Sequence, residues 1–163
     1  MGEATHGIRP RELGLAKPNQ EGETNMNKIL FATDGSSYSK KAYPVIETLL
    51  SKWPDVQVIV LYVSPTTMLP ADNHSPGTSE PEGNYAKELK EETLAAFKPW
   101  EPRVQFQVVA GPPTLTICDV ANHEGVDLIV VGSHGKGAFD RLVLGSVSHG
   151  VLNRAKMSVL VVK

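Results

Sequence analysis

The sequence predicts one α/β domain whose parallel β-sheet is covered by helices on both faces. From residue 28 to residue 163, five short apolar and β-branched stretches alternate with longer stretches that carry apolar residues at helical spacing. Consecutive parallel strands need crossover connections, and right-handed crossovers place helices on both sides of such a sheet. We therefore expect a three-layer α/β/α sandwich built on a five-stranded parallel sheet.

Residues 1–25 differ in composition from the rest of the chain. They contain Gly, Pro, Glu, Lys and Arg without apolar periodicity, and they lack the apolar core of about 7–15 residues that a secretory signal needs. We interpret residues 1–25 as a flexible leader outside the fold, with two origins left open: an addition made during cloning, or a docking tail. Residues 26–163 are interpreted as the folded domain, with Met26 as a plausible original start.

The first half of the domain should contain two strands and the helix between them. Residues 28–33 and 56–63 are apolar enough for buried strands, and residues 36–52 have helical periodicity. Residues 64–82 are rich in Pro, Thr, Ser, Asn and Gly, which indicates a long loop. The apolar face of the helix is formed by Ala42, Val45, Ile46, Leu49 and Leu50.

The second half repeats the alternation of helices and strands. Helices are predicted at residues 85–97, 114–124 and 146–155, and strands at residues 103–110, 126–131 and 158–162. Strand order cannot be derived from this pattern alone.

Composition excludes several classes of protein. The chain has 163 residues, of which 40% are hydrophobic and 21% charged, as expected for a globular domain. Its formal net charge of −2 argues against a nucleic-acid binder, and no apolar run approaches the roughly 18 residues that span a bilayer. The single Cys118 cannot form an internal disulfide, so we expect a cytoplasmic protein.

A glycine pattern near the C-terminus predicts a phosphate site. Gly132-Ser-His134-Gly135 directly follows a predicted buried strand, and nine residues later Gly145-Ser146-Val147-Ser148 opens a predicted helix. Glycines after a strand allow a positive φ and close approach of a ligand to the backbone. The start of a helix offers amide groups and a positive dipole end that suit phosphate. The spacing G-x2-G-x9-G-S therefore indicates a nucleotide-binding loop.

This glycine pattern resembles that of the universal stress protein family, in its ATP-binding subtype. Lys28-Ile-Leu-Phe-Ala-Thr-Asp34-Gly35-Ser36 is similar to the family's first strand and the acidic turn that follows it. The closing Ser158-Val-Leu-Val-Val-Lys163 is similar to its last strand. The resemblance covers everything except the leader.

The resemblance implies a fold, a ligand and an assembly. The implied fold is Rossmann-like, of the adenine nucleotide alpha hydrolase type, with strand order 3-2-1-4-5. The implied ligand is ATP with Mg²⁺ or Mn²⁺, and Asp34 is the candidate metal ligand through the nucleotide. The implied binding residues are Ala32, Thr33, Asp34, Val63, Val131, Gly132, His134, Gly135, Gly145, Ser146, Val147 and Ser148. In that strand order residues 157–162 form an uncharged apolar edge, which predicts a homodimer through the last strand.

Alternative interpretations remain open for several of these residues. Asp34 also suits a simple turn or a helix cap, the glycines suit ordinary turns, and a loop histidine such as His134 is often only solvated. The Walker A and Rossmann patterns do not fit the sequence around Gly135. The leading hypothesis is an ATP-binding regulatory protein of the stress response without a dedicated catalytic residue. A slow ATPase or phosphoryl-transfer protein using the same cleft, and a nucleotide-independent interaction module, are the alternatives.

Overall fold

The computed structural model describes residues 26–64, 80–135 and 144–163. The predicted leader and most of the predicted loop at residues 64–82 lie outside these ranges, as do residues 136–143 between the two halves of the glycine motif. The strands are β1 (Lys28–Ala32), β2 (Gln57–Ser64), β3 (Val104–Ala110), β4 (Leu128–Gly132) and β5 (Ser158–Val162). The helices are α1 (Ser37–Lys40), α2 (Tyr43–Lys52), α3 (Glu80–Ala96), the short 3-10 helix η2 (Lys98–Trp100), α4 (Pro113–Glu124) and α5 (Ser146–Arg154).

The five strands form one parallel sheet in the order β3-β2-β1-β4-β5. This confirms the predicted α/β class and the strand order implied by the family resemblance. The order reverses direction at β1, because the chain builds outward through β2 and β3 and then crosses to β4 on the other side of β1. The carboxyl ends of β1 and β4 therefore border a topological switch point, which is the usual ligand position in open α/β sheets.

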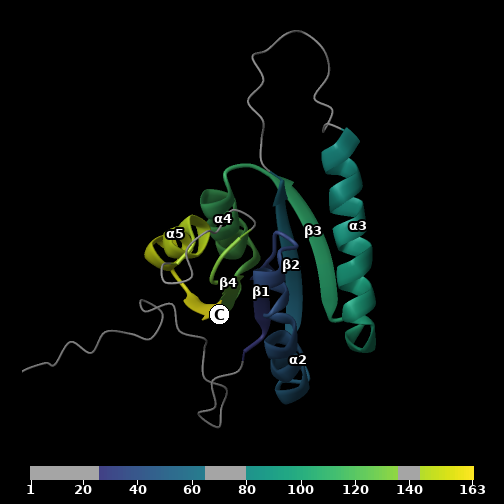
Figure 1. The fold of residues 1–163 in the computed structure, drawn as a ribbon. Helices are drawn as coiled ribbons and strands as arrows, with labels where there is room; N and C mark the ends of the chain where they lie inside the picture. Colours follow the sequence, from purple (N-terminus) through teal and green to yellow (C-terminus); the bar gives the residue numbers. More distant parts are fainter. Residues whose placement is uncertain (1–25, 65–79, 136–143) are drawn as a thin grey trace, which may run out of the picture.

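Helices lie on both faces of the sheet (Figure 1), and a hydrophobic cluster fills the space on each face. On one face, alternate residues of the central strands such as Phe31 and Val130 pack against Ile46 and Leu50 of α2. On the other face, Leu30 and Ile129 belong to the cluster that includes residues of α4 and α5. Side chains of a strand alternate between faces, so one apolar run supplies both clusters. This is why the central strands read as continuously hydrophobic.

The predicted helix at residues 36–52 is wrong as a single element. It is divided into α1 and α2 by a turn at Lys41 and Ala42. Pro44 lies in the first turn of α2, and a proline has no amide hydrogen to continue the hydrogen bonds of a preceding helix. The first helix is started by Ser36, whose hydroxyl accepts a hydrogen bond from the Ser39 amide.

Helix α3 begins five residues earlier than predicted, at Glu80 rather than Tyr85. The predicted loop is therefore wrong at residues 80–82. Proline is tolerated in the first turn of a helix and acidic residues are favoured there, so Glu80-Pro81-Glu82 suits a helix start. Other boundaries differ from the predictions by one or two residues.

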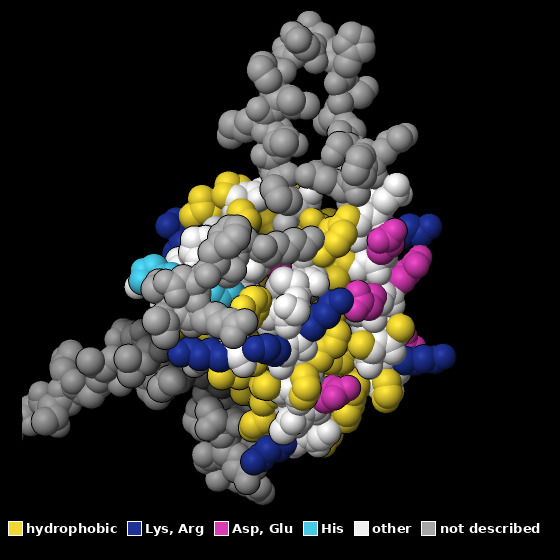
Figure 2. Space-filling view, in the orientation of Figure 1, with side chains coloured by type: hydrophobic (Ala, Val, Ile, Leu, Met, Phe, Trp, Pro, Cys, Tyr) yellow, Lys and Arg dark blue, Asp and Glu magenta, His cyan; other side chains and the backbone are white. Residues whose placement is uncertain are grey.

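Positively and negatively charged side chains both occur on the face of the molecule in Figure 2. On the face in Figure 2, lysine and arginine side chains are separated by uncharged and acidic ones, and acidic side chains gather near α3. Among the helices that the structure describes, none combines the length and the apolar character needed to cross a membrane.

Candidate functional site

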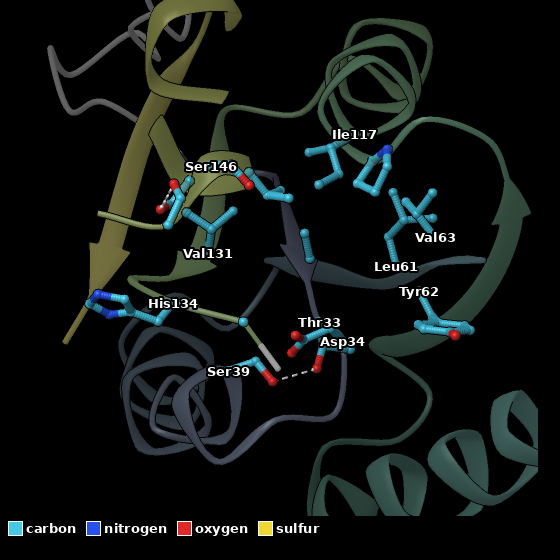
Figure 3. A pocket seen from close by; sticks show the side chains of 17 residues that line it. Thr33, Asp34, Ser39, Leu61, Tyr62, Val63, Ile117, Val131, His134 and Ser146 are labelled. Atoms are coloured by element: carbon cyan, nitrogen blue, oxygen red, sulfur yellow. Dashed lines mark hydrogen bonds between the residues drawn. The ribbon is translucent and has the colours of Figure 1, made fainter. Parts of the chain in front are cut away.

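A cleft of about 460 Å³ lies at the switch point between the carboxyl ends of β1 and β4 (Figure 3). Ligand sites of this kind commonly measure about 300–1,000 Å³. Its lining comes from the ends of β1, β2 and β4, the loops that follow β1 and β4, helix α1, and the amino-terminal parts of α4 and α5. Segments far apart in sequence are thus brought to one edge of the sheet.

All twelve residues that the sequence analysis proposed for the nucleotide line this cleft. They are Ala32, Thr33, Asp34, Val63, Val131, Gly132, His134, Gly135, Gly145, Ser146, Val147 and Ser148. The structure thus brings both halves of the glycine motif and the end of β1 to one cavity.

Five further lining residues were missed: Ser39, Leu61, Tyr62, Pro113 and Ile117. Leu61 and Tyr62 precede Val63 in β2, so their position near the strand end could have predicted that they line the cleft. Pro113 and Ile117 belong to the start of α4, which follows β3, and only the strand order shows that this helix reaches the cleft.

The loop after β1 is held by short hydrogen bonds. The Thr33 hydroxyl donates to Ser39 Oγ over 3.0 Å and accepts from the Gly35 amide over 3.1 Å. Asp34 Oδ1 accepts from the Ser36 amide over 3.0 Å, which is an Asx-type turn. Thr33 is buried, so this polar network fixes the loop beneath the cleft.

Asp34 and Gly135 meet across the cleft floor. A Cβ built on Gly135 would stand 2.8 Å from Asp34 Oδ2, which is closer than real Cβ contacts. Oδ1 is used within its own loop, and Oδ2 is turned toward the glycine loop. The carboxylate of the first loop therefore borders the backbone of the second.

The motif glycines allow close approach rather than a left-handed backbone. Gly145 has a φ of −61°, and neither Gly132 nor Gly135 has a positive φ, so the positive φ expected for glycines after the strand is wrong for Gly132 and Gly135. A Cβ on Gly132 would lie 3.0 Å from the Ser39 backbone. Glycine at this position lets β4 pass directly against α1.

The glycine loop is joined to the start of α5. The Gly145 amide donates to the Ser133 carbonyl over 2.8 Å. The buried Ser148 hydroxyl lies 3.0 Å from that same carbonyl and 2.9 Å from the Gly145 carbonyl, so its proton is engaged by backbone. The two halves of the motif are therefore one connected unit, even though residues 136–143 are outside the described part of the chain.

The amino terminus of α5 suits an anion. Its cap residue is Gly145, which has no side chain to satisfy the first-turn amides, and its first turn contains no acidic residue. Those amides have no carbonyl one turn earlier in the helix, and the helix dipole is positive at this end. Ser146 begins the helix and lines the cleft with an exposed side chain.

His134 lines the cleft, and one of its two ring nitrogens is engaged by a neighbour. The ring Nδ1 lies 3.0 Å from the Ser133 hydroxyl, and the ring packs on Tyr38 with centroids 5.1 Å apart. Figure 3 shows the ring beside the end of β5, on the far side of the cleft from Tyr62. Nδ1 is thus engaged by its neighbour, whereas the buried Nε2 has no hydrogen-bond partner among the described residues.

Nucleophilic and multi-ligand metal sites are not found in the described residues. Cys118 is buried in α4, and burial raises the pKa of its thiol, which disfavours the reactive thiolate. Within the described ranges, no three His, Cys, Asp or Glu side chains are grouped to hold a metal ion. Among the described lining residues, Asp34 supplies the one carboxylate.

Comparison with known proteins places this geometry in a family. The model of the universal stress protein family matches residues 25–163. The universal stress protein MJ0531 of Methanocaldococcus jannaschii is 33% identical over 151 residues, which cover 88% of this chain and 86% of that protein.

Solved structures of other proteins superpose on this chain and have the same fold. The structure of MJ0577 from Methanocaldococcus jannaschii superposes with a TM-score of 0.66 at 30% identity, covering 85% of this chain and 96% of that one. An Arabidopsis thaliana family protein with AMP bound has a TM-score of 0.60 at 20% identity, covering 84% of this chain and 91% of that one. A universal stress protein in complex with cAMP has a TM-score of 0.65 at 22% identity, covering 85% and 97% respectively. The sheet order, the match along residues 25–163 and the identity with MJ0531 lead to one conclusion: the chain belongs to the universal stress protein family.

Proposed function

We propose that this protein is an ATP-binding regulatory protein of the stress response, and that the switch-point cleft is its nucleotide site. The observation that carries the proposal is the convergence of both glycine segments and the Asp34 loop on one cavity of about 460 Å³. Relatives of the same fold support it, since structures with AMP and with cAMP are known.

The cleft is divided into an apolar part and a polar part. Leu61, Val63 and Ile117 line one part, and Figure 3 shows them grouped together, away from Asp34 and His134. A purine ring buries well between aliphatic side chains, and the strand-end backbone of β2 offers hydrogen bonds to its edge. The adenine is therefore assigned to this apolar part.

The phosphates are assigned to the polar part, between the glycine loop and the start of α5. Backbone amides and the helix dipole at Ser146 and Val147 provide the attraction, so no cluster of basic side chains is required. Gly135, which lines the cleft without a side chain, leaves room for phosphate oxygens to approach the backbone.

A divalent cation fits beside Asp34. Mg²⁺ and Mn²⁺ prefer oxygen ligands and are commonly held by one or two carboxylates together with phosphate oxygens. Asp34 Oδ2 is turned toward the glycine loop, where the phosphates are placed. Such a cation would neutralise phosphate charge and align the phosphate chain with the carboxylate.

Hydrolysis of ATP is the second candidate, and the described residues favour it less. Phosphoryl transfer requires a group that positions the attacking water in addition to charge neutralisation. Asp34 is the one carboxylate among the described lining residues, and the proposed metal contact occupies it. Binding without rapid turnover suits a regulatory role.

Two copies of the chain are proposed to pair through β5. This strand pairs with β4 on one side and forms an edge of the sheet in the described structure. Its sequence Ser158-Val-Leu-Val-Val lacks the proline or charge that usually protects an edge. Pairing across a two-fold axis satisfies the exposed backbone groups. A cytoplasmic location, inferred from the single buried Cys118, belongs to the same proposal.

The proposal is tested by calorimetric titration of ATP into nucleotide-free protein in the presence of Mg²⁺. One site per chain, with a dissociation constant below about 1 mM, is expected. Absence of binding at that concentration would reject the nucleotide site and leave the interaction module as the better hypothesis.

A further inference from the structure

Helix α3 contacts the Asp34 loop at two successive residues. The Tyr85 hydroxyl donates a hydrogen bond to the Asp34 carbonyl over 2.7 Å. The next residue, Gly35, has a φ of 76°, and a Cβ there would collide with Tyr85 Oη and stand 3.1 Å from Leu89 Cδ1. Because both the backbone angle and the space exclude a side chain, the loop is fitted closely beneath α3.

Tyr85 also touches a second wall of the cleft. Its ring packs edge-on against Tyr62 of β2, with centroids 5.6 Å apart and an interplanar angle of 64°. Tyr62 is buried and lines the cleft, and Figure 3 shows it on the same side of the cleft as Asp34, nearest to α3. One tyrosine of α3 thus links the loop after β1 with the end of β2.

The direction of the Asp34 carboxylate depends on the backbone that Tyr85 holds. Oδ1 is fixed by the Ser36 amide, and the Gly35 amide is fixed by Thr33 Oγ1. These two bonds tie the position of the carboxylate to the backbone of residues 34–36. The Tyr85 bond to the Asp34 carbonyl opposes movement of that backbone from outside the loop.

We propose that Tyr85 is a positioning residue that aims the Asp34 carboxylate at metal-bound ATP and couples the docking of α3 to occupancy of the cleft. That the ligand is ATP rests on the proposed function. That Tyr85 holds the Asp34 loop does not depend on it. Coupling between two equilibria is reciprocal, so bound Mg-ATP must also strengthen the docking of α3 at Tyr85.

The test compares Tyr85→Phe with Tyr43→Phe. Tyr43 of α2 makes the matched contact, because its hydroxyl lies 3.2 Å from Thr93 Oγ1 on the same helix α3. Each variant removes one oxygen that fastens α3 to the core. Calorimetry should show that Tyr85→Phe weakens Mg-ATP binding about fivefold or more, whereas Tyr43→Phe changes it less than about twofold. Equal effects of the two variants would overturn the positioning role.

A double-mutant cycle shows whether Tyr85 acts through Asp34. In the Asp34→Asn background the carboxylate no longer carries its charge, so Tyr85→Phe should weaken Mg-ATP binding by less than about twofold. The same loss in both backgrounds would mean that Tyr85 only supports the fold, and the proposal would be rejected.

Hydrogen exchange measured without nucleotide separates this inference from the proposed function. Tyr85→Phe should accelerate exchange of the Gly35 and Ser36 amides about fivefold or more relative to the parent, and Tyr43→Phe should leave them unchanged. If the parent protein binds no ATP, the proposed function fails while accelerated exchange still supports the holding of the loop by Tyr85. Unchanged exchange at both amides would overturn the inference even if the parent binds ATP.

Discussion

Asp34 and Gly135 face each other closely: a Cβ at residue 135 would stand 2.8 Å from Asp34 Oδ2. One residue follows β1 and the other follows β4, so their contact joins the two strands that flank the switch point. The obstacle to a side chain at residue 135 is the movable end of an aspartate. At Gly132 the obstacle is the Ser39 backbone, 3.0 Å from a Cβ. The two glycines of the first half of the motif thus have different roles, one at the cleft and one in the fold.

Gly135→Val should abolish ATP binding and leave the domain folded. The valine side chain displaces Asp34 and occupies space assigned to phosphate, so we expect the affinity measured by calorimetry to fall at least about tenfold. Gly125→Asn is the matched control. Gly125 has a φ of 64°, which asparagine tolerates, and a Cβ there has no neighbour within 4 Å. The cleft assignment is wrong if Gly135→Val binds ATP within about threefold of the parent, a difference below 1 kcal/mol.

Asp34→Asn should remove most of the gain in ATP affinity that Mg²⁺ or Mn²⁺ provides. The amide keeps the size of the side chain but loses the charge that a divalent cation requires. The measurement is ATP affinity with the metal and with a chelator, in both proteins. Asp127→Asn serves as control, since Asp127 accepts hydrogen bonds from the Asn27 and Lys28 amides at the opposite end of β1. An unchanged metal dependence in Asp34→Asn would reduce Asp34 to a turn residue.

Arg103→Lys should destabilise the fold without changing ATP affinity. The guanidinium contacts four backbone carbonyls, those of Leu50, Trp53, Pro54 and Val56, at 2.8–3.4 Å. One ammonium group cannot serve all four positions, so we expect a loss of about 2 kcal/mol in the free energy of unfolding by urea. Arg154→Lys, on the exposed face of α5, should change it by less than about 0.5 kcal/mol. Similar stabilities of the two variants would show that the Arg103 contacts contribute little.

The protein should be a dimer at tens of micromolar. Leu160 and Val162 pack against the core cluster that includes Phe31 and Val130, so lysine at either position would unfold the domain before it tested the interface. Light scattering on the unmodified protein avoids this difficulty. Twice the chain mass is expected, and a monomer mass at this concentration would reject pairing through β5.

Local patterns in the sequence predicted most of the fold and the central residues of the site. The five strands were visible because they are buried on both faces, and the glycine spacing located one wall of the cleft. What the sequence did not show depends on contacts between distant segments. The approach of Pro113 and Ile117 follows from strand order, and the bond from Tyr85 to Asp34 joins residues 51 positions apart. The role of the motif glycines was mistaken for the same reason, because the neighbours of Gly132 and Gly135 come from the first loop and α1.

The most direct test of the central claim is the position of ATP on the protein. Backbone amide NMR of uniformly labelled protein, titrated with ATP and Mg²⁺, reports each segment of the cleft separately. We expect the largest shifts at residues 32–34, 132–135 and 145–148, with residues near Asp127 at the opposite end of the sheet unchanged. No shifts up to about 1 mM ATP, or shifts confined to residues outside the cleft, would contradict the assignment of this cleft as the nucleotide site.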